Sequence, residues 1–484
     1  MRRLLAGTAA LAACSTGYAL SGDLDTDRVR LTVVMVLWWA VALVTIRWVL
    51  RPRARGAAAG PSSPVPLRHA ALLVFAAALA VQLPGVLSPP RSSSDAYRYV
   101  WDGRVQLSGI SPYRYAPLDD RLSRLRDPIL FAGLGPDDHS GYTTQPLPTD
   151  RIEVLARSAN DPRTVINRPQ VPTIYPPIAQ AWFTIVAAIT PWSGGTRGLQ
   201  AGSALLAAGV AAALAALLRR RGRDAWGALW WAWCPAVVAE AGNGAHVDVL
   251  AAGLVVAGLA ASVSVGGDRR RGAAGLAGVL VGLAIAVKLY PAVVLTSLFS
   301  LRHNASRAVV AAAAAALTVA LAYLPHWLAA GHLVLGYLPA YLVEESGPNR
   351  AGILSLVLPT DAVAPVAVLL LALVAGLVAW RGVACPGRDP AAGAAVVLGA
   401  LLLLTTPSYP WYALPLVACA VLAGRLEWFA VAAAALLAYA SVSVHPLPTI
   451  AYATSALVVL AAVVCRSRRR PRVDEPVPAR ARGR

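Results

Sequence analysis

Apolar segments of about the length that crosses a bilayer recur from one end of this 484-residue chain to the other. A membrane-spanning helix needs about 20 mostly apolar residues, because its backbone groups can bond only to one another in lipid. Hydrophobic residues make up 57% of the chain and charged residues only 14%, whereas soluble domains carry about 25% charged residues. The sequence therefore predicts an all-α polytopic membrane protein.

The positive charge of the chain is gathered in short arginine clusters at the ends of apolar segments. A formal net charge of +19 would, taken alone, be compatible with a nucleic-acid partner. Clusters beside membrane spans instead set orientation, since they stay on the cytoplasmic side and contact anionic headgroups. We therefore expect no nucleic-acid partner, a cell-membrane location, contact with membrane lipids, and both termini in the cytoplasm.

The arginine clusters also constrain two ambiguous segments. Residues 176–192 are apolar enough to cross, but a crossing there would export the arginines of 219–223, so we predict a helix in the outer interface. Residues 273–299 must then go out and return, breaking near Lys288-Leu289-Tyr290-Pro291, where proline removes a backbone donor. A single long pass is the alternative. With these choices about fourteen helices cross the membrane.

The chain is predicted to have four regions. Two transmembrane helices and a cytoplasmic linker occupy residues 1–68, and a helical module with a large outer loop (90–197) occupies residues 69–350. Further transmembrane helices occupy residues 351–465, and a basic, disordered cytoplasmic tail occupies residues 466–484. The five cysteines lie far apart without a CxxC pattern, so neither a disulfide framework nor a zinc site is expected.

Most of the unusual polar residues fall on the predicted outer face. Asp95 follows the third apolar segment by a few residues. A carboxylate at the membrane surface can act as a general base if it is held near the proton that it removes. An aromatic belt with Asp–Arg pairs is the structural alternative. Further candidates for substrate binding in the same loop are Arg98, Asp102, Arg104, Tyr113 and Tyr175.

Ionisable residues inside apolar sequence are candidates for function, because inserting one into a bilayer costs roughly 2.5–3.5 kcal/mol. His246 and Asp248 open one apolar segment and are expected to pair, with a simple helix cap as the alternative. Lys288, the only lysine of the chain, requires an anion such as a carboxylate or a ligand's phosphate, unless it snorkels to the surface. The remaining outer candidates are Tyr290, Asn349, Arg350, Tyr409 and Trp411.

The order of these motifs and their common side resemble the GT-C superfamily of membrane glycosyltransferases. The resemblance is greatest to the bacterial polyprenyl-phosphate-mannose-dependent mannosyltransferases of glycosyltransferase family 87 and covers roughly residues 70–465. It rests on Asp95, Trp101-Asp102-Gly103-Arg104, Ser111-Pro112-Tyr113, Tyr175-Pro176-Pro177, His246-Val247-Asp248, Lys288-Leu289-Tyr290-Pro291 and Tyr409-Pro410-Trp411-Tyr412.

This resemblance implies a GT-C fold whose outer loop is catalytic and carries interfacial helices. It also implies an early acidic residue as the base, which maps to Asp95, with Asp102 as a second candidate. The expected reaction moves a sugar, mannose by analogy, from a polyprenyl-phosphate donor to a hydroxyl of an extracytoplasmic glycan, glycolipid or other acceptor, with inversion.

The cations and the remaining polar residues are expected to assist that transfer. Lys288, with Arg104 or Arg350, would stabilise the leaving phosphate, while His246 and Asp248 would orient the sugar or the base. No cofactor and no metal site are expected. A transporter or flippase of lipid-linked saccharides is the alternative, and it would favour ionisable residues near the membrane midplane.

Overall fold

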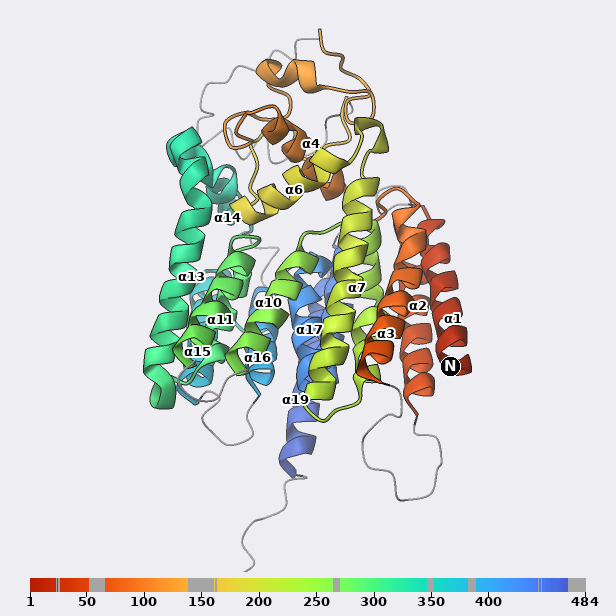
Figure 1. The fold of residues 1–484 in the computed structure, drawn as a ribbon, viewed down its shortest axis with the longest axis vertical. Coiled ribbons are helices and arrows are strands. Elements are labelled where there is room, and N and C mark those ends of the chain that lie inside the picture. The colour runs from red at the N-terminus through yellow and green to blue at the C-terminus, as the bar shows by residue number, and fades with distance from the viewer. Residues whose placement is uncertain are drawn as a thin grey trace, which may run out of the picture.

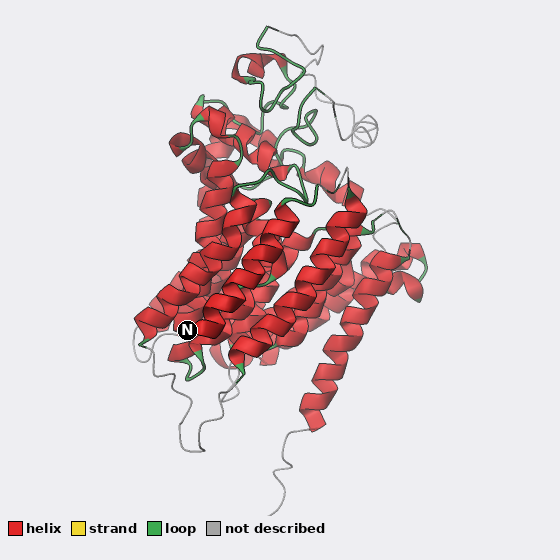
Figure 2. Ribbon diagram, turned by 90° about the vertical axis from the view of Figure 1, so that its right-hand side faces the viewer, coloured by secondary structure: helices red, strands yellow, loops and turns green. Residues whose placement is uncertain are grey.

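The computed structural model describes residues 1–22, 24, 27–51, 66–137, 161, 163–263, 270–345, 352–381, 389–442, 444 and 446–468. Within these ranges the regular secondary structure is helical and no strand occurs. Long helices stand roughly side by side, and a layer of loops and short helices lies over one end of them (Figure 1 and Figure 2). The predicted all-α polytopic architecture is confirmed.

The elements fall into three groups along the chain. The long helices of the N-terminal half are α1 (Arg2–Ala19), α2 (Arg28–Leu50), α3 (Leu67–Val86) and α7 (Arg197–Arg220). The helical elements of the outer layer are α4 (Asp95–Leu107), the 3-10 turn Asp120–Leu125 and α6 (Pro177–Ile189). The return from α7 consists of short pieces, namely Ala225–Ala228, α8 (Leu229–Ala232), α9 (Pro235–Val237) and the π-helical turn Val238–Asn243.

The C-terminal half of the bundle alternates long and short helices. They are α10 (Asp248–Val263), α11 (Arg270–Ile285), the 3-10 turn Tyr290–Val294, α12 (Leu295–Leu298), α13 (Leu301–Ala330), α14 (Leu338–Glu345), α15 (Thr360–Arg381), α16 (Pro390–Thr405), α17 (Leu414–Ala423), α18 (Phe429–Ala440) and α19 (Leu447–Arg468). Small residues let neighbours approach closely: a Cβ at Gly278 or Gly282 of α11 would meet the backbone of α13.

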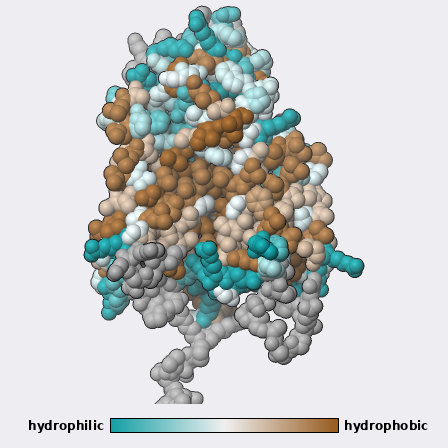
Figure 3. Space-filling model, in the orientation of Figure 1, coloured by the Kyte–Doolittle hydropathy of each residue, from teal (hydrophilic) through white to brown (hydrophobic). Residues whose placement is uncertain are grey.

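Six helical runs in the described ranges are long and apolar enough to span a membrane. They are α2, α3, α7, α15, α19 and the run that begins with α13. A seventh span results if the bent pair Pro235–Asn243 and Asp248–Val263 is counted as one. Apolar side chains form a belt between hydrophilic upper and lower edges (Figure 3). The chain is thus a multi-pass membrane protein, while the count of fourteen crossings stays a prediction.

The two ambiguous segments follow the paths predicted from charge. Helix α6 lies crosswise above α10 and α11 rather than along them, as an interfacial helix does (Figure 1). Helices α11 and α13 both begin at the lower end of the bundle in this view. Residues 286–300 therefore bring the chain back between them, which agrees with a break at Lys288 and not with a single long pass.

Candidate active site

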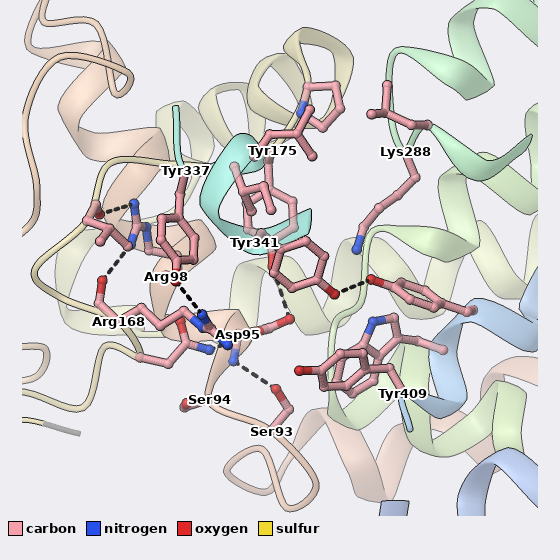
Figure 4. Close-up of a pocket in the computed structure, with 18 of the residues that line it drawn as sticks. Ser93, Ser94, Asp95, Arg98, Arg168, Tyr175, Lys288, Tyr337, Tyr341 and Tyr409 are labelled. Carbon is pink, nitrogen blue, oxygen red and sulfur yellow. Dashed lines mark hydrogen bonds between the residues drawn. The ribbon is translucent and has the colours of Figure 1, made fainter. Parts of the chain in front are cut away.

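A cavity of about 440 Å³ lies where the outer layer meets the helical bundle (Figure 4). Its walls come from segments far apart in sequence: the starts of α4 and α6, the loop around Asn167, the break after α11, α14, and the turn before α17. The predicted site residues that line it are Asp95, Arg98, Tyr175, Lys288, Tyr290, Tyr409 and Trp411. Folding thus gathers the early carboxylate and the single lysine at one place.

Asp95 is the first residue of α4, and its side chain is 14% exposed. One carboxylate oxygen accepts a hydrogen bond from the Asn167 amide at 2.5 Å. The other accepts hydrogen bonds from the hydroxyls of Tyr175 at 3.0 Å and Tyr99 at 3.3 Å. These donors fix the orientation of the carboxylate at the cavity wall, and the start of a helix further favours a negative charge.

The surroundings of Asp95 keep its carboxyl group ionised. Burial raises the pKa of Asp95, because it disfavours the charged form. The charges of His246 and Lys288 and the hydrogen bonds from Asn167 and Tyr175 lower this pKa by more, so that it lies below its ordinary value. At neutral pH the group is therefore in the form that can accept a proton.

Asp102 lies behind the cavity wall, where its hydrogen-bonding capacity is used. It accepts hydrogen bonds from Arg98 Nε at 3.0 Å, Thr173 Oγ1 at 2.6 Å and Gln180 Nε2 at 3.0 Å. The same Arg98 guanidinium donates to the carbonyls of Arg168 and Val171, at 3.2 and 3.1 Å. The buried Arg98–Asp102 pair therefore shapes the wall, and Asp95 is the carboxylate of α4 that faces the cavity.

Two other predicted ligands of the outer loop do not line the cavity. The Arg104 guanidinium pairs with Asp127, donates to the carbonyl of Trp192 at 2.8 Å and stacks over the Trp192 ring. The Tyr113 hydroxyl donates to the carbonyl of Tyr175 at 2.7 Å, so this residue supports the wall from behind. Asn349 and Arg350 lie outside the described residues.

Lys288 lies at the break between α11 and the following 3-10 turn. Its Nζ is 3.6 Å from the buried Asp248 carboxylate, which also accepts a hydrogen bond from the Tyr290 hydroxyl at 3.0 Å. The ammonium lies over the rings of Tyr175 and Tyr412, 5.2 and 5.0 Å from their centroids. Aromatic faces attract a cation. Asp248 and the two rings therefore stabilise the charge of Lys288, and its side chain still lines the cavity (Figure 4).

His246 lies directly behind Asp95 and does not form the predicted pair with Asp248. Its Nε2 is 3.8 Å from the Asp95 carboxylate, whereas Asp248 binds Lys288 and Tyr290. The imidazole is fully buried and stacks on Trp411, with ring centroids 3.8 Å apart and an interplanar angle of 14°. The difference arises because His246 lies in the 120° break before α10, whereas Asp248 is the first residue of α10, so that their side chains meet different neighbours.

Several lining residues were not predicted from the sequence. Arg168 has a positive φ of 46°, and its guanidinium binds Glu344 of α14 through two oxygens. Tyr337 and Tyr341 line the same side. Asn167 and Arg168 come from a polar stretch without periodicity, and no motif marked α14. In the described part of the chain, no three His, Cys, Asp or Glu side chains gather so that they could hold a metal ion.

Two family models match the chain. The model described as Glycosyltransferase family 87 matches residues 173–407, which include His246 and Lys288. The model described as Alpha-(1->6)-mannopyranosyltransferase, N-terminal domain, matches residues 4–127, which include Asp95. No curated protein and no solved structure matched the chain. Together with the helical fold, the two matches show that the chain is a GT-C-type membrane glycosyltransferase that is similar to glycosyltransferase family 87.

Proposed function

We propose that this enzyme transfers a mannosyl group from a polyprenyl-phosphate carrier to a hydroxyl of an extracytoplasmic acceptor, with inversion and with Asp95 as the base. The observation that carries the proposal is that an ionised carboxylate and an ammonium line one cavity at the edge of an apolar bundle. The match to a mannopyranosyltransferase domain supports mannose as the sugar.

The two charges suit the two ends of a single displacement. The acceptor hydroxyl gives its proton to Asp95 as its oxygen forms a bond to the anomeric carbon. The bond from that carbon to the carrier phosphate breaks, and its electron pair goes to the phosphate oxygen. Tyr175 contacts both charged side chains. Its hydroxyl donates a hydrogen bond to Asp95, and its ring faces the Lys288 ammonium. Attack and departure on opposite faces of the sugar invert its configuration.

The leaving phosphate is proposed to lie between the cations of the cavity. Lys288 and Arg168 both line it, whereas Arg104 is bound to Asp127 away from it and takes no part. A preorganised contact to charge that develops in the transition state contributes about 2.7–4 kcal/mol. Leu289, Leu338 and Leu342 line the same cavity and would contact the first isoprene units next to the phosphate.

The sidedness of the site follows from the arginine clusters. The N-terminus and the end of α19 both lie at the end of the bundle opposite the outer layer (Figure 1). Arg2, Arg3, Arg466 and Arg468 are at that end. Positive clusters stay cytoplasmic, which supports cytoplasmic termini and a cavity that opens on the extracytoplasmic side of the cell membrane.

Replacement of the proposed base tests this function. The purified protein and its Asp95→Asn variant would be given labelled polyprenyl-phosphate-mannose and a set of saccharide acceptors. Loss of a general base lowers the rate by about 10²–10⁴-fold. Asp137→Asn, at an exposed position of the same layer, serves as the matched control and is expected to keep full activity. Unchanged transfer by Asp95→Asn, or a product that retains the donor's anomeric configuration, would contradict the proposal.

A further inference from the structure

A second buried carboxylate lies behind the proposed base. Glu240 belongs to the π-helical turn Val238–Asn243, and its side chain is fully buried. Its Oε2 is 2.9 Å from Nδ1 of His246, whose Nε2 is 3.8 Å from the Asp95 carboxylate. One imidazole therefore stands between two carboxylates, in the order Glu240, His246, Asp95.

We propose that Glu240 is a positioning residue that holds His246 as an imidazolium directed at Asp95, so that the base stays ionised between turnovers. This inference rests on the proposed function, because it assigns a role relative to Asp95 as base. In this arrangement Nδ1 is the ring nitrogen near Glu240 and Nε2 is the one near Asp95. The acceptor's proton still goes to Asp95; Glu240 touches neither substrate nor proton and acts only through His246.

The local backbone has an unusual shape that brings Glu240 and His246 together. The chain bends by 120° between Pro235–Asn243 and Asp248–Val263. Ala245 has a φ of +54°, a left-handed conformation that costs a non-glycine residue about 1–3 kcal/mol. The His246 N–H donates to the carbonyl of Glu240 at 2.8 Å, which closes the turn. Single π-helical turns are frequent at functional sites, and here the turn brings the side chains of Glu240 and His246 together.

Other contacts also restrict the position of the imidazole ring. Trp411 stacks on one face, and a Cβ at Gly244 would approach Nδ1 to 2.6 Å. The Asn243 side chain donates to the carbonyls of Gly85 and Pro89 and to Ser88 Oγ, and accepts a hydrogen bond from the backbone N–H of Arg91. Asn243 thus fixes the turn that carries His246, while Trp411 and Gly244 leave its ring no room to rotate toward another partner.

The charged groups next to His246 are two carboxylates, those of Glu240 and Asp95. A buried carboxylate without a partner is strongly destabilising. Among the described residues neither carboxylate oxygen of Glu240 has a hydrogen-bond partner, and the ion-pair contact of this carboxylate is the one with His246 at 2.9 Å. On the Asp95 side the facing groups are Lys288, Asp248, Tyr99 and Tyr175. On the Glu240 side they are Tyr18 of α1 and, next to it, Arg91. A positive imidazole between the carboxylates offsets one of the two negative charges that flank it, and Lys288 lies on the Asp95 side.

Glu240→Gln is expected to move the pH dependence of the reaction. The substitution removes the negative charge that favours the protonated imidazole, and Asp95 then loses a neighbouring positive charge. An opposite charge within about 4–6 Å lowers a carboxyl pKa by roughly 1–3 units, so the pKa of Asp95 rises by that order. The acidic limb of kcat/KM shifts upward by the same amount, and activity recovers as the pH is raised.

The test is a pH profile of kcat and kcat/KM for Glu240→Gln beside the wild type. Glu427→Gln is the matched control, since Glu427 is also a nearly buried, ion-paired glutamate but lies next to Arg466, far from the cavity in the fold. Glu240→Asp keeps the charge and should return the limb toward its wild-type position. A uniform loss at every pH, or an unmoved limb, would refute the role of Glu240.

A double-mutant cycle covers the case in which Glu240→Gln fails to fold. Glu240→Asp and His246→Gln are each measured alone and combined. The shorter side chain of Glu240→Asp moves the carboxylate away from His246. If Glu240 acts through His246, the small shift of the acidic limb that remains in Glu240→Asp disappears beside His246→Gln. Shifts that add in the double variant would refute the proposal. A different outcome would separate the two proposals. If Asp95→Asn kept full activity while Glu240→Gln still shifted the acidic limb, only the assignment of Asp95 as the base would be wrong.

Discussion

Replacing Lys288 by methionine removes the ammonium while it keeps an unbranched side chain of similar length. The Nζ atom lies 3.6 Å from the buried Asp248 carboxylate, so the variant leaves that carboxylate without its cation. Breaking a buried ion pair in this way destabilises a fold by about 3–5 kcal/mol. If Lys288 also contacts the leaving phosphate, the loss of one preorganised contact lowers kcat by about 10²–10³-fold. Lys288→Met alone is therefore expected to lose both stability and activity.

A second substitution separates these two effects. In Lys288→Met/Asp248→Asn the uncompensated charge is gone, and the new amide still offers an oxygen to the Tyr290 hydroxyl, now 3.0 Å from the carboxylate. The midpoint of thermal unfolding, followed by tryptophan fluorescence, should return close to that of Asp248→Asn. In contrast, kcat with labelled donor should stay about 10²–10³-fold below the wild-type value. If kcat recovered together with stability, Lys288 would act only through Asp248 and the proposed phosphate contact would be wrong.

Two further predictions concern the support of the base and its protonation. A Cβ at Gly103 would lie 2.5 Å from the Phe183 carbonyl oxygen. Gly103→Ala should therefore force α4 away from α6, destabilise the protein by about 1–3 kcal/mol and lower kcat. An unchanged thermal unfolding midpoint would contradict this prediction. The lowered pKa of Asp95 predicts that kcat/KM falls only below the ordinary aspartate value of about 3.9, since protonation removes the base, and a fall centred above pH ~5 would contradict it.

The site residues that could be predicted from the sequence are ionisable residues whose insertion into a membrane requires much free energy. Lys288 and His246 stand out because an ionisable group within apolar sequence requires a partner. The same criterion also marks Glu240, in the stretch AVVAEAGNG, which lies just before the His246-Val247-Asp248 motif. The expected His246–Asp248 pair was wrong because the left-handed Ala245 and the following bend direct the two side chains differently.

Helical geometry would also have placed Arg104. It follows Asp95 by about two and a half turns at 3.6 residues per turn, so on α4 the two residues lie on opposite faces. The orientation of α6 was predictable from charge alone, since it depends on where arginines can lie. Asn167, Arg168 and the tyrosines before and within α14 were not predictable, because irregular segments reach the cavity through tertiary contacts that no periodicity encodes.

The side chain of Asn243 ties the loop that precedes Asp95 to the turn that carries His246. This link through Asn243 therefore connects the position of Asp95 to the interior of the bundle, in addition to the contacts that Asp95 makes within the outer layer. Substitutions in outer segments that contact neither Asp95 nor this link would leave Asp95 and His246 aligned.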